Sequence, residues 1–300
     1  MKKEAMFYEA FYDHVLCHLC PHECNIKEGN RGMCRVRGAL RDEKGMLRLY
    51  TFNYAEVSSL AVDPVEKKPL GRLYPGTLIL SAGSYGCNMK CLFCQNYHIA
   101  HEDPETLFIT PQDMLEKVRQ HRESIGLAFT YNEPTVWYEY VLDTAQLIKS
   151  EMPEKKIVLV TNGYINPEPL KKLLPYIDAM NIDLKGGDEF YRSICSGKMK
   201  EVMDSIRLAD EMGVHVEVST LIVGERNSDE KTLTEIGEFI RSVNPDITLH
   251  ISRYFPCYRM NDPSTDIATM KKAYHTLKKM LRDVRPGNVT SEEFRRITEN

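Results

Sequence analysis

From residue 77 onward, apolar and polar positions follow two alternating patterns. Short runs of β-forming apolar residues indicate buried strands at residues 77–82, 126–130, 156–161, 178–183, 214–221 and 247–252. Between them, apolar residues recur at helical spacing, which indicates helices at residues 111–123, 134–149, 167–174, 200–212, 228–243 and 266–282. Strands that alternate with helices predict βα units around a parallel sheet, and therefore an α/β fold.

The rest of the sequence predicts additional segments before and after this α/β unit. Residues 1–40 are rich in cysteine and predict a small metal-binding module. Residues 41–75 contain short β-forming runs and end near a Lys-Lys-Pro-Leu-Gly break, so they predict a β-rich connector. The α/β unit then covers residues 76–265, and residues 266–300 form a C-terminal helix and tail.

Composition narrows the class of protein. Of the 300 residues, 42% are hydrophobic, which is enough for one large core. The net charge of −4 argues against a protein that coats nucleic acid, and no apolar run is long enough to cross a bilayer. The N-terminus has no apolar signal core, so we expect a cytoplasmic protein. Its nine cysteines should then be metal ligands or reactive thiols rather than disulfides.

Three cysteines follow the first predicted strand with the spacing C-x3-C-x2-C: Cys87, Cys91 and Cys94. Glycines end the strand at residues 83 and 86, which places these cysteines on a loop. Three thiolates on a [4Fe–4S] cluster leave one iron with an open position for a substrate or cofactor. A zinc ribbon or three buried core cysteines are the alternatives.

A second set of cysteines lies near the N-terminus: Cys17, Cys20, Cys24 and Cys34. Four thiols at this spacing suit a closed structural zinc site or an auxiliary iron–sulfur cluster, and the spacing alone does not separate the two. Four unliganded thiols are the alternative. His18 and His22 are expected to be loop residues, because four thiols already complete a tetrahedron.

With Phe93 before its third cysteine, the C-x3-C-x2-C motif resembles that of the radical S-adenosylmethionine (SAM) superfamily. The resemblance implies a partial (β/α)6 barrel, similar to a TIM barrel but open, with a [4Fe–4S] cluster and SAM as cofactors. Together with the N-terminal cysteines and the Tyr-Asn-Glu-Pro-Thr after the second strand, the sequence is similar to the radical SAM member of the AmmeMemoRadiSam system, within the group related to pyruvate formate-lyase activating enzymes. The similarity runs from about Cys17 to about Tyr258, and this chain lacks the terminal pair of cysteines usual in that subfamily.

Polar residues gather after the predicted strands, where a parallel barrel places its chemistry. The resemblance implies that Glu133 binds the amino group of SAM, although Tyr131-Asn132 stand where activating enzymes have two glycines. It implies that Asp183 and Lys185 also reach SAM. The complete set expected at the cofactor is Asn132, Glu133, Thr161, Asn162, Asp183, Lys185, His250 and Arg253.

Several of these residues have a structural alternative. Glu133 could cap the helix that begins at Pro134, Asp183 and Lys185 could form an internal ion pair, and His250 could be structural.

Two more cysteines follow the fourth and sixth strands: Cys195 and Cys257. Either could act in catalysis by donating a hydrogen atom to a radical intermediate, whereas free cysteines are commonly small buried residues.

Two classes of function remain. The first is an oxidoreductase that cleaves SAM to a radical, with a low-potential electron donor such as ferredoxin or flavodoxin. Its substrate is expected to be a partner polypeptide, with glycyl radical formation as the leading form and a small molecule or another protein as the alternative. The second class is a non-catalytic metal-binding or electron-transfer protein. We expect neither nucleic acid nor a membrane as a partner.

Overall fold

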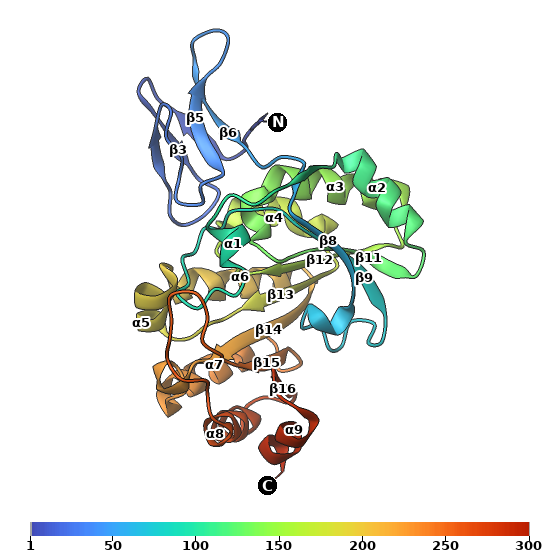
Figure 1. The fold of residues 1–300 in the computed structure, drawn as a ribbon, viewed down its shortest axis with the longest axis vertical. Coiled ribbons are helices and arrows are strands. Elements are labelled where there is room, and N and C mark those ends of the chain that lie inside the picture. Colours follow the sequence, from blue (N-terminus) through green and yellow to red (C-terminus); the bar gives the residue numbers. More distant parts are fainter. Residues whose placement is uncertain (1, 300) are drawn as a thin grey trace.

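The computed structural model describes residues 2–299, and its fold is centred on one eight-stranded sheet (Figure 1). The strand order is β16-β15-β14-β13-β12-β11-β9-β8. All six predicted strands lie in this sheet and pair in parallel, as β9 (Leu78–Gly83), β11 (Ser124–Phe129), β12 (Lys156–Thr161), β13 (Ala179–Asp183), β14 (His215–Ile222) and β15 (Thr248–Arg253). The predicted α/β class with a central parallel sheet is therefore confirmed.

Two further strands form the edges of this sheet. β8 (Ser59–Pro64) pairs antiparallel with β9, and β16 (Val284–Gly287) pairs parallel with β15. The C-terminal tail therefore supplies a seventh parallel strand, which the sequence pattern does not predict. The pattern misses this strand because it contains Pro286, and proline is depleted from strands. Proline is tolerated here because β16 is an edge strand, where no neighbouring strand needs the missing amide.

Helices connect the parallel strands, and all six predicted helices are present. They are α2 (Pro111–Gln120), α3 (Tyr138–Glu151), α4 (Pro167–Leu173), α6 (Met199–Glu211), α7 (Glu230–Val243) and α8 (Ile267–Lys278). At the start of α2, the Thr110 side chain accepts from the Asp113 amide while the Asp113 carboxylate accepts from the Thr110 amide, a reciprocal cap. In residues 2–299 no helix is long and apolar enough to cross a membrane.

Further helical segments complete the fold. The α-helical ones are α1 (Tyr97–Ala100), α5 (Asp188–Phe190) and α9 (Ser291–Thr298). The 3-10 helices are η1 (Val65–Lys67), η2 (Pro134–Trp137), η3 (Leu174–Tyr176) and η5 (Gly224–Arg226), and a π-helical turn, η4, spans Tyr191–Cys195.

The N-terminal part of the chain forms two small antiparallel sheets at the end of the molecule opposite α8 and α9 (Figure 1). One has the order β1-β6-β5, from Lys3–Glu4, Leu47–Thr51 and Arg37–Arg41; the other has the order β2-β3-β4, from Tyr8–Ala10, His14–Cys17 and Asn25–Lys27. The predicted connector contributes β6 here, β7 (Glu56–Val57) to a pair with β10 (Leu107–Phe108), and β8 to the central sheet. We refer to β1 to β6 as the N-terminal module.

A buried ion pair joins the N-terminal module to the central unit. Arg37 on β5 contacts the carboxylate of Glu139 on α3, and both side chains are 1% exposed. The same guanidinium donates to the Met6 carbonyl (3.1 Å), and Glu139 accepts from the Met6 amide (2.8 Å). The pair therefore fixes the N-terminal module to helix α3 of the central unit.

A loop between β8 and β9 crosses the amino end of the parallel strands, and we call residues 65–77 the floor loop. Glu217 on β14 holds it by accepting from the amides of Gly71 (2.9 Å) and Arg72 (2.8 Å). Asn181 on β13 also donates to the carbonyl of Pro69 (2.8 Å). The amino end of the barrel is therefore covered by backbone that two inward-facing side chains hold in place.

We expect the acid stability of the protein to depend on Glu217. Burial acts to raise the pKa of this carboxyl, but hydrogen bonds from His215, His250 and the two loop amides outweigh burial and leave the pKa well below its ordinary value. A depressed carboxyl pKa contributes stability above the ordinary value, roughly 4.3, and this contribution is lost as the pH falls through the lower folded-state pKa. Glu217→Gln should therefore lose on the order of 3 kcal/mol at pH 7, because the new amide group faces donors.

The measurement is urea unfolding of both proteins between pH 7 and pH 3. The difference between wild type and Glu217→Gln should shrink as the pH falls. Glu238→Gln, at an exposed position on α7, is the matched control. Equal stabilities of wild type and Glu217→Gln at pH 7 would contradict the assignment.

Candidate active site

One large cavity, of about 510 Å³, opens among the carboxyl ends of the parallel strands. It brings together most of the residues that the sequence singled out. Those that line it are Cys87, Cys91, Cys94, Asn132, Glu133, Thr161, Asn162, Asp183 and Lys185. Residues from four separate segments of the chain thus meet at one site, as expected for the carboxyl end of a parallel barrel.

The three cysteines lie on the loop between β9 and α1, residues 84–96, which we call the cysteine loop. Its Gly86 has a φ of 87° and lies so close to the N-terminal module that a Cβ there would be 2.8 Å from the Cys34 carbonyl oxygen. Asn132 supports the loop by donating to the Gly86 carbonyl (3.0 Å) and accepting from the Ser84 amide (2.9 Å). A residue without a side chain is therefore required where the two parts of the fold touch.

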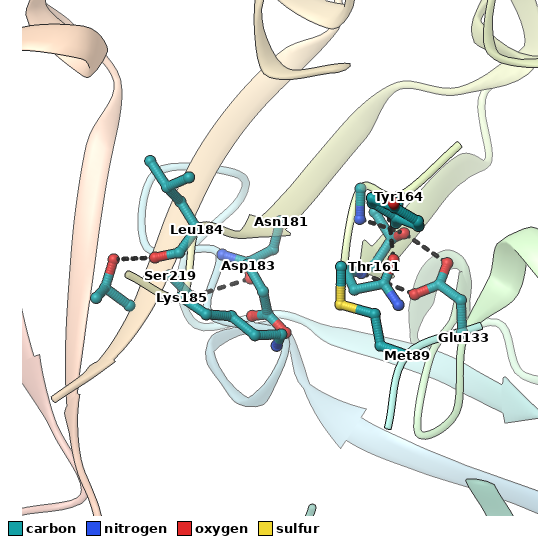
Figure 2. Close-up of polar contacts among 12 residues, drawn as sticks. Met89, Glu133, Thr161, Tyr164, Asn181, Asp183, Leu184, Lys185 and Ser219 are labelled. Atoms are coloured by element: carbon teal, nitrogen blue, oxygen red, sulfur yellow. Dashed lines mark hydrogen bonds and ion pairs between the residues drawn. The ribbon is translucent and has the colours of Figure 1, made fainter. Parts of the chain in front are cut away.

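Glu133 presents a buried carboxylate beside this loop. The side chain is 2% exposed and accepts from the Thr161 hydroxyl (2.6 Å) and the amides of Asn162 (2.7 Å) and Thr135 (2.9 Å). Burial raises the pKa of the carboxyl against the lowering effect of these hydrogen bonds. Figure 2 shows Glu133 turned toward Thr161. Through the hydrogen bond from the Thr135 amide, Glu133 also caps the N-terminus of η2. Glu133 therefore both caps a helix, as in the alternative interpretation, and lines the cavity.

Asp183 and Lys185 form an ion pair at the end of β13, with 2.7 Å between the carboxylate and the ammonium (Figure 2). Both line the cavity, so pairing with each other does not remove them from it. Burial disfavours the charge on Lys185, but Asp183 and the Cys91 thiol outweigh burial and raise the pKa of the ammonium well above its ordinary value. A fixed positive charge therefore lies close to the cysteine loop.

His250 and Arg253 do not line the cavity, in contrast to the prediction. His250 on β15 faces inward but lies one layer nearer the floor, where its Nε2 is 2.6 Å from the Glu217 carboxylate. Arg253 points to the opposite face of the same strand and donates to the Thr265 carbonyl (2.6 Å) and the Glu293 carboxylate (2.9 Å). Ser252 lines the cavity instead, because alternate strand residues share one face.

Sequence reasoning missed the polar residues on the cavity floor. Asp63 pairs with Lys68 (2.8 Å) and accepts from the phenol of Tyr131 (2.6 Å), and all three line the cavity. Lys68 also lies 4.5 Å from the Tyr131 ring centre. Tyr131 has a φ of 72°, which is uncommon for a bulky residue. The one signal for this residue in the sequence was its position, since it stands where activating enzymes carry glycine.

Neither Cys195 nor Cys257 reaches the cavity. Cys195 is 0% exposed and lies behind the cysteine loop, and the Cys257 thiol lies 3.6 Å from the Cys94 carbonyl oxygen. The structure therefore does not bring either predicted hydrogen-atom donor to the lining of the site.

The four N-terminal cysteines, Cys17, Cys20, Cys24 and Cys34, line a second, small cavity. Burial raises the pKa of the Cys20 thiol to about 12 and that of Cys34 to about 11. Of the two predicted loop histidines, His18 lies between two carboxylates, 3.6 Å from Glu9 and 3.7 Å from Glu23. His22 instead contacts the Asn88 carbonyl oxygen in the cysteine loop (2.7 Å). The module therefore touches the loop through His22 as well as through Gly86.

The donors of the large cavity fit a [4Fe–4S] cluster. Its lining combines three thiols with the cation of Lys185, which offsets thiolate charge. In the described part of the chain, no three His, Cys, Asp or Glu side chains are arranged to hold a single metal ion. Thiolates that bind different irons of one cluster need no such single-ion arrangement.

Comparison with known proteins identifies the family. The chain matches the Radical SAM superfamily over residues 82–240, more than half of its length, and it belongs to that superfamily. Members of this superfamily are enzymes that use a [4Fe–4S] cluster and SAM.

Individual relatives agree with this placement. The chain is 40% identical over 298 residues to the uncharacterized protein MJ0808 of Methanocaldococcus jannaschii, covering 97% of this chain and 86% of that protein. It is 23% identical over 220 residues to the pyruvate formate-lyase-activating enzyme of Clostridium pasteurianum, covering 65% of this chain and 88% of that enzyme. The structure of a radical SAM methyltransferase from Sphaerobacter thermophilus has the same fold, with a TM-score of 0.56 at 14% identity, covering 83% of this chain and 72% of that one. The narrower similarity to the AmmeMemoRadiSam system stays a prediction.

Proposed function

We propose that this protein cleaves SAM reductively and uses the resulting radical to abstract hydrogen from a partner polypeptide. The observation that carries the proposal is the single cavity in which Cys87, Cys91 and Cys94 face Glu133 and the Asp183–Lys185 pair. Cys87, Cys91 and Cys94 would hold a [4Fe–4S] cluster, which, once reduced by a low-potential donor, would supply the electron for cleavage of SAM to methionine and a 5′-deoxyadenosyl radical. That radical would take one hydrogen atom from the substrate, leaving 5′-deoxyadenosine and a substrate radical.

The residues around the cavity have separate roles in this proposal. Glu133 binds the ammonium of SAM, because a buried carboxylate gains most from a charge-assisted hydrogen bond. Lys185 faces the carboxylate of SAM, and Asp183 accepts from its ribose. A non-catalytic electron carrier needs no such amino-acid site. The test is to incubate the reconstituted protein with SAM and dithionite. Formation of methionine and 5′-deoxyadenosine would identify an enzyme rather than an electron carrier.

Replacing Glu133 should weaken SAM binding without unfolding the protein. A hydrogen bond to a charged group contributes about 1.5–3 kcal/mol, so Glu133→Gln should raise the Kd for SAM at least about tenfold. The measurement is calorimetric titration of the reconstituted protein with SAM. The exposed Glu238→Gln variant should bind SAM as wild type does, and an unchanged Kd for Glu133→Gln would remove the proposed ammonium contact.

The partner polypeptide is proposed from the similarity to activating enzymes, with glycyl radical formation as the leading form. The open edge of the sheet suits a chain segment that must enter beside the adenosyl carbon. The test is electron paramagnetic resonance (EPR) of the anaerobic protein with a candidate glycyl radical enzyme, SAM and a low-potential donor such as flavodoxin. A glycine-centred doublet supports this substrate.

A small-molecule substrate is the second candidate, and the polar floor favours it. Asp63, Lys68 and Tyr131 place charged and hydrogen-bonding groups deep in the cavity. A backbone loop that enters from the mouth has no evident use for them. Deuterium passing from a labelled metabolite into 5′-deoxyadenosine, with no radical on any partner protein, would select this candidate.

We also propose a separate metal centre at Cys17, Cys20, Cys24 and Cys34. Four thiols at this spacing suit either a structural zinc ion or an auxiliary iron–sulfur cluster. A closed four-thiolate site contributes folding free energy directly, so replacing the four cysteines should lower thermal stability before it lowers SAM cleavage. Elemental analysis of a variant lacking Cys87, Cys91 and Cys94 should still find metal, and finding neither iron nor zinc would refute the centre.

A further inference from the structure

One residue of the cysteine loop, Asn88, faces the N-terminal module instead of the large cavity. Its neighbours Cys87 and Met89 line the large cavity, whereas Asn88 lines the small cavity of the N-terminal cysteines together with His22. Asn88 is also 0% exposed. The backbone of the cysteine loop therefore separates the two cavities at this point, with the first cysteine on one side and the module on the other.

Three hydrogen bonds hold Asn88 in this place. Its side chain donates to the Tyr164 carbonyl (2.7 Å) and accepts from the Asn162 side chain (2.9 Å), both on the loop after β12. Its carbonyl oxygen is 2.7 Å from Nε2 of His22. Because a carbonyl oxygen can only accept, Nε2 of His22 carries the proton and donates. The N-terminal module and the barrel thus hold the same residue from two sides.

The groups around Asn88 also contact the sulfur of Cys87. Nδ2 of Asn162, which donates to Asn88, lies 3.7 Å from this sulfur, and the amide of Met89 lies 3.4 Å from it. The first of these N–H groups is tied to the Asn88 side chain, and the second belongs to the next residue of the chain. A displacement of Asn88 would therefore disturb both N–H groups at the Cys87 sulfur.

We propose that His22 is a positioning residue of the active site, whose Nε2–H group holds the Asn88 carbonyl and thereby keeps Cys87 in the geometry that takes the cluster. The proposal rests on the proposed ligation of the cluster by Cys87. Groups that orient a ligand and donate to its sulfur determine the properties of a bound cluster. The N-terminal module then completes the active site in addition to stabilising the fold.

The test compares the reconstituted full-length protein with His22→Ala, His22→Gln and the control His18→Ala. All of them keep the seven cysteines of the two sites. The side chain of His18 lies in the same module but faces Glu9 and Glu23 rather than the cysteine loop. The measurements are the Kd for SAM by calorimetry and the change in the EPR spectrum of the reduced protein when SAM is added. This spectral change reports the cluster that binds SAM, whatever metal the N-terminal cysteines hold.

His22→Ala should raise the Kd for SAM about fivefold, the factor expected for the loss of one ordinary hydrogen bond, and should alter the spectral change. His22→Gln keeps an N–H donor at a similar distance from the backbone and should restore both measurements. His18→Ala should resemble wild type. His22→Leu is a second variant without a donor that keeps more apolar volume, in case alanine destabilises the module, and circular dichroism checks the fold of each variant.

The proposal is overturned if the folded His22→Ala and His22→Leu variants bind SAM with the Kd and spectral change of wild type. It is also overturned if His22→Gln weakens SAM binding as much as alanine does, since the donor is then not the cause, or if His18→Ala has an equal effect. If the thiols of Cys87, Cys91 and Cys94 hold no cluster, the proposed function fails and this inference fails with it. The iron content of a variant lacking the four N-terminal cysteines identifies that case separately.

Discussion

Replacing Cys87, Cys91 and Cys94 together by alanine is expected to abolish SAM cleavage completely. These thiols supply all three proposed ligands, and none of the remaining cysteines lines the same cavity. The fold should persist, since the core of the sheet is made by apolar residues of strands and helices away from this loop. Anaerobic reconstitution followed by chromatography of 5′-deoxyadenosine and methionine measures the loss, and circular dichroism checks the fold.

The control for this experiment is Cys257→Ala, which removes a cysteine beside the loop without touching its three thiols. It should keep its iron and most of its cleavage activity. Full cleavage by the triple variant would show that the electron reaches SAM by another route, and the assignment of these three ligands would then be wrong.

Breaking the buried Arg37–Glu139 pair is expected to cause the largest loss of stability. Each side chain is 1% exposed, so removing one partner leaves the other charge buried without compensation, at a cost of about 3–5 kcal/mol. Arg37→Ala and Glu139→Ala should each unfold at clearly lower urea concentrations than wild type. Because the pair joins the N-terminal module to α3, the module should become susceptible to proteolysis first.

A double variant tests the physical reason for this loss. Arg37→Met with Glu139→Leu removes both charges and keeps apolar volume, so it should be more stable than either single alanine variant. The exposed pair of Glu116 and Arg119 on α2 is the matched control, and its removal should change stability by less than about 1 kcal/mol. If the double variant loses as much as the two single variants added together, desolvated charge is not the cause.

The strands and helices of the barrel were predictable because each follows a strong local pattern. Strands buried on both faces read as unbroken apolar runs, and helix starts carry caps such as Thr110 with Asp113. The three cysteines were predictable because their spacing within one loop restricts what they can bind. Strand β16 was not, since Pro286 removes the local signal and only its neighbour β15 makes it a strand.

The depth of a residue within the barrel could not be predicted from the sequence either. His250 and Ser252 lie on the same face of β15, yet one faces the floor and the other the cavity, and periodicity alone cannot separate layers. Asp63 on β8 and Lys68 on the floor loop reach the cavity from the amino end of the parallel strands, and neither segment carries a motif. Only the tertiary structure shows that these two residues line the cavity.

The floor loop has a consequence for the order of events in a catalytic cycle. Because Glu217 and Asn181 hold backbone across the amino end of the barrel, molecules enter and leave the cavity from the carboxyl end. If SAM binds as proposed and a small-molecule substrate reaches Lys68, that substrate must arrive before SAM closes the path above it, and methionine and 5′-deoxyadenosine must depart before it is released. The proposed function would then require an ordered sequence of binding and release, with the deepest occupant first in and last out.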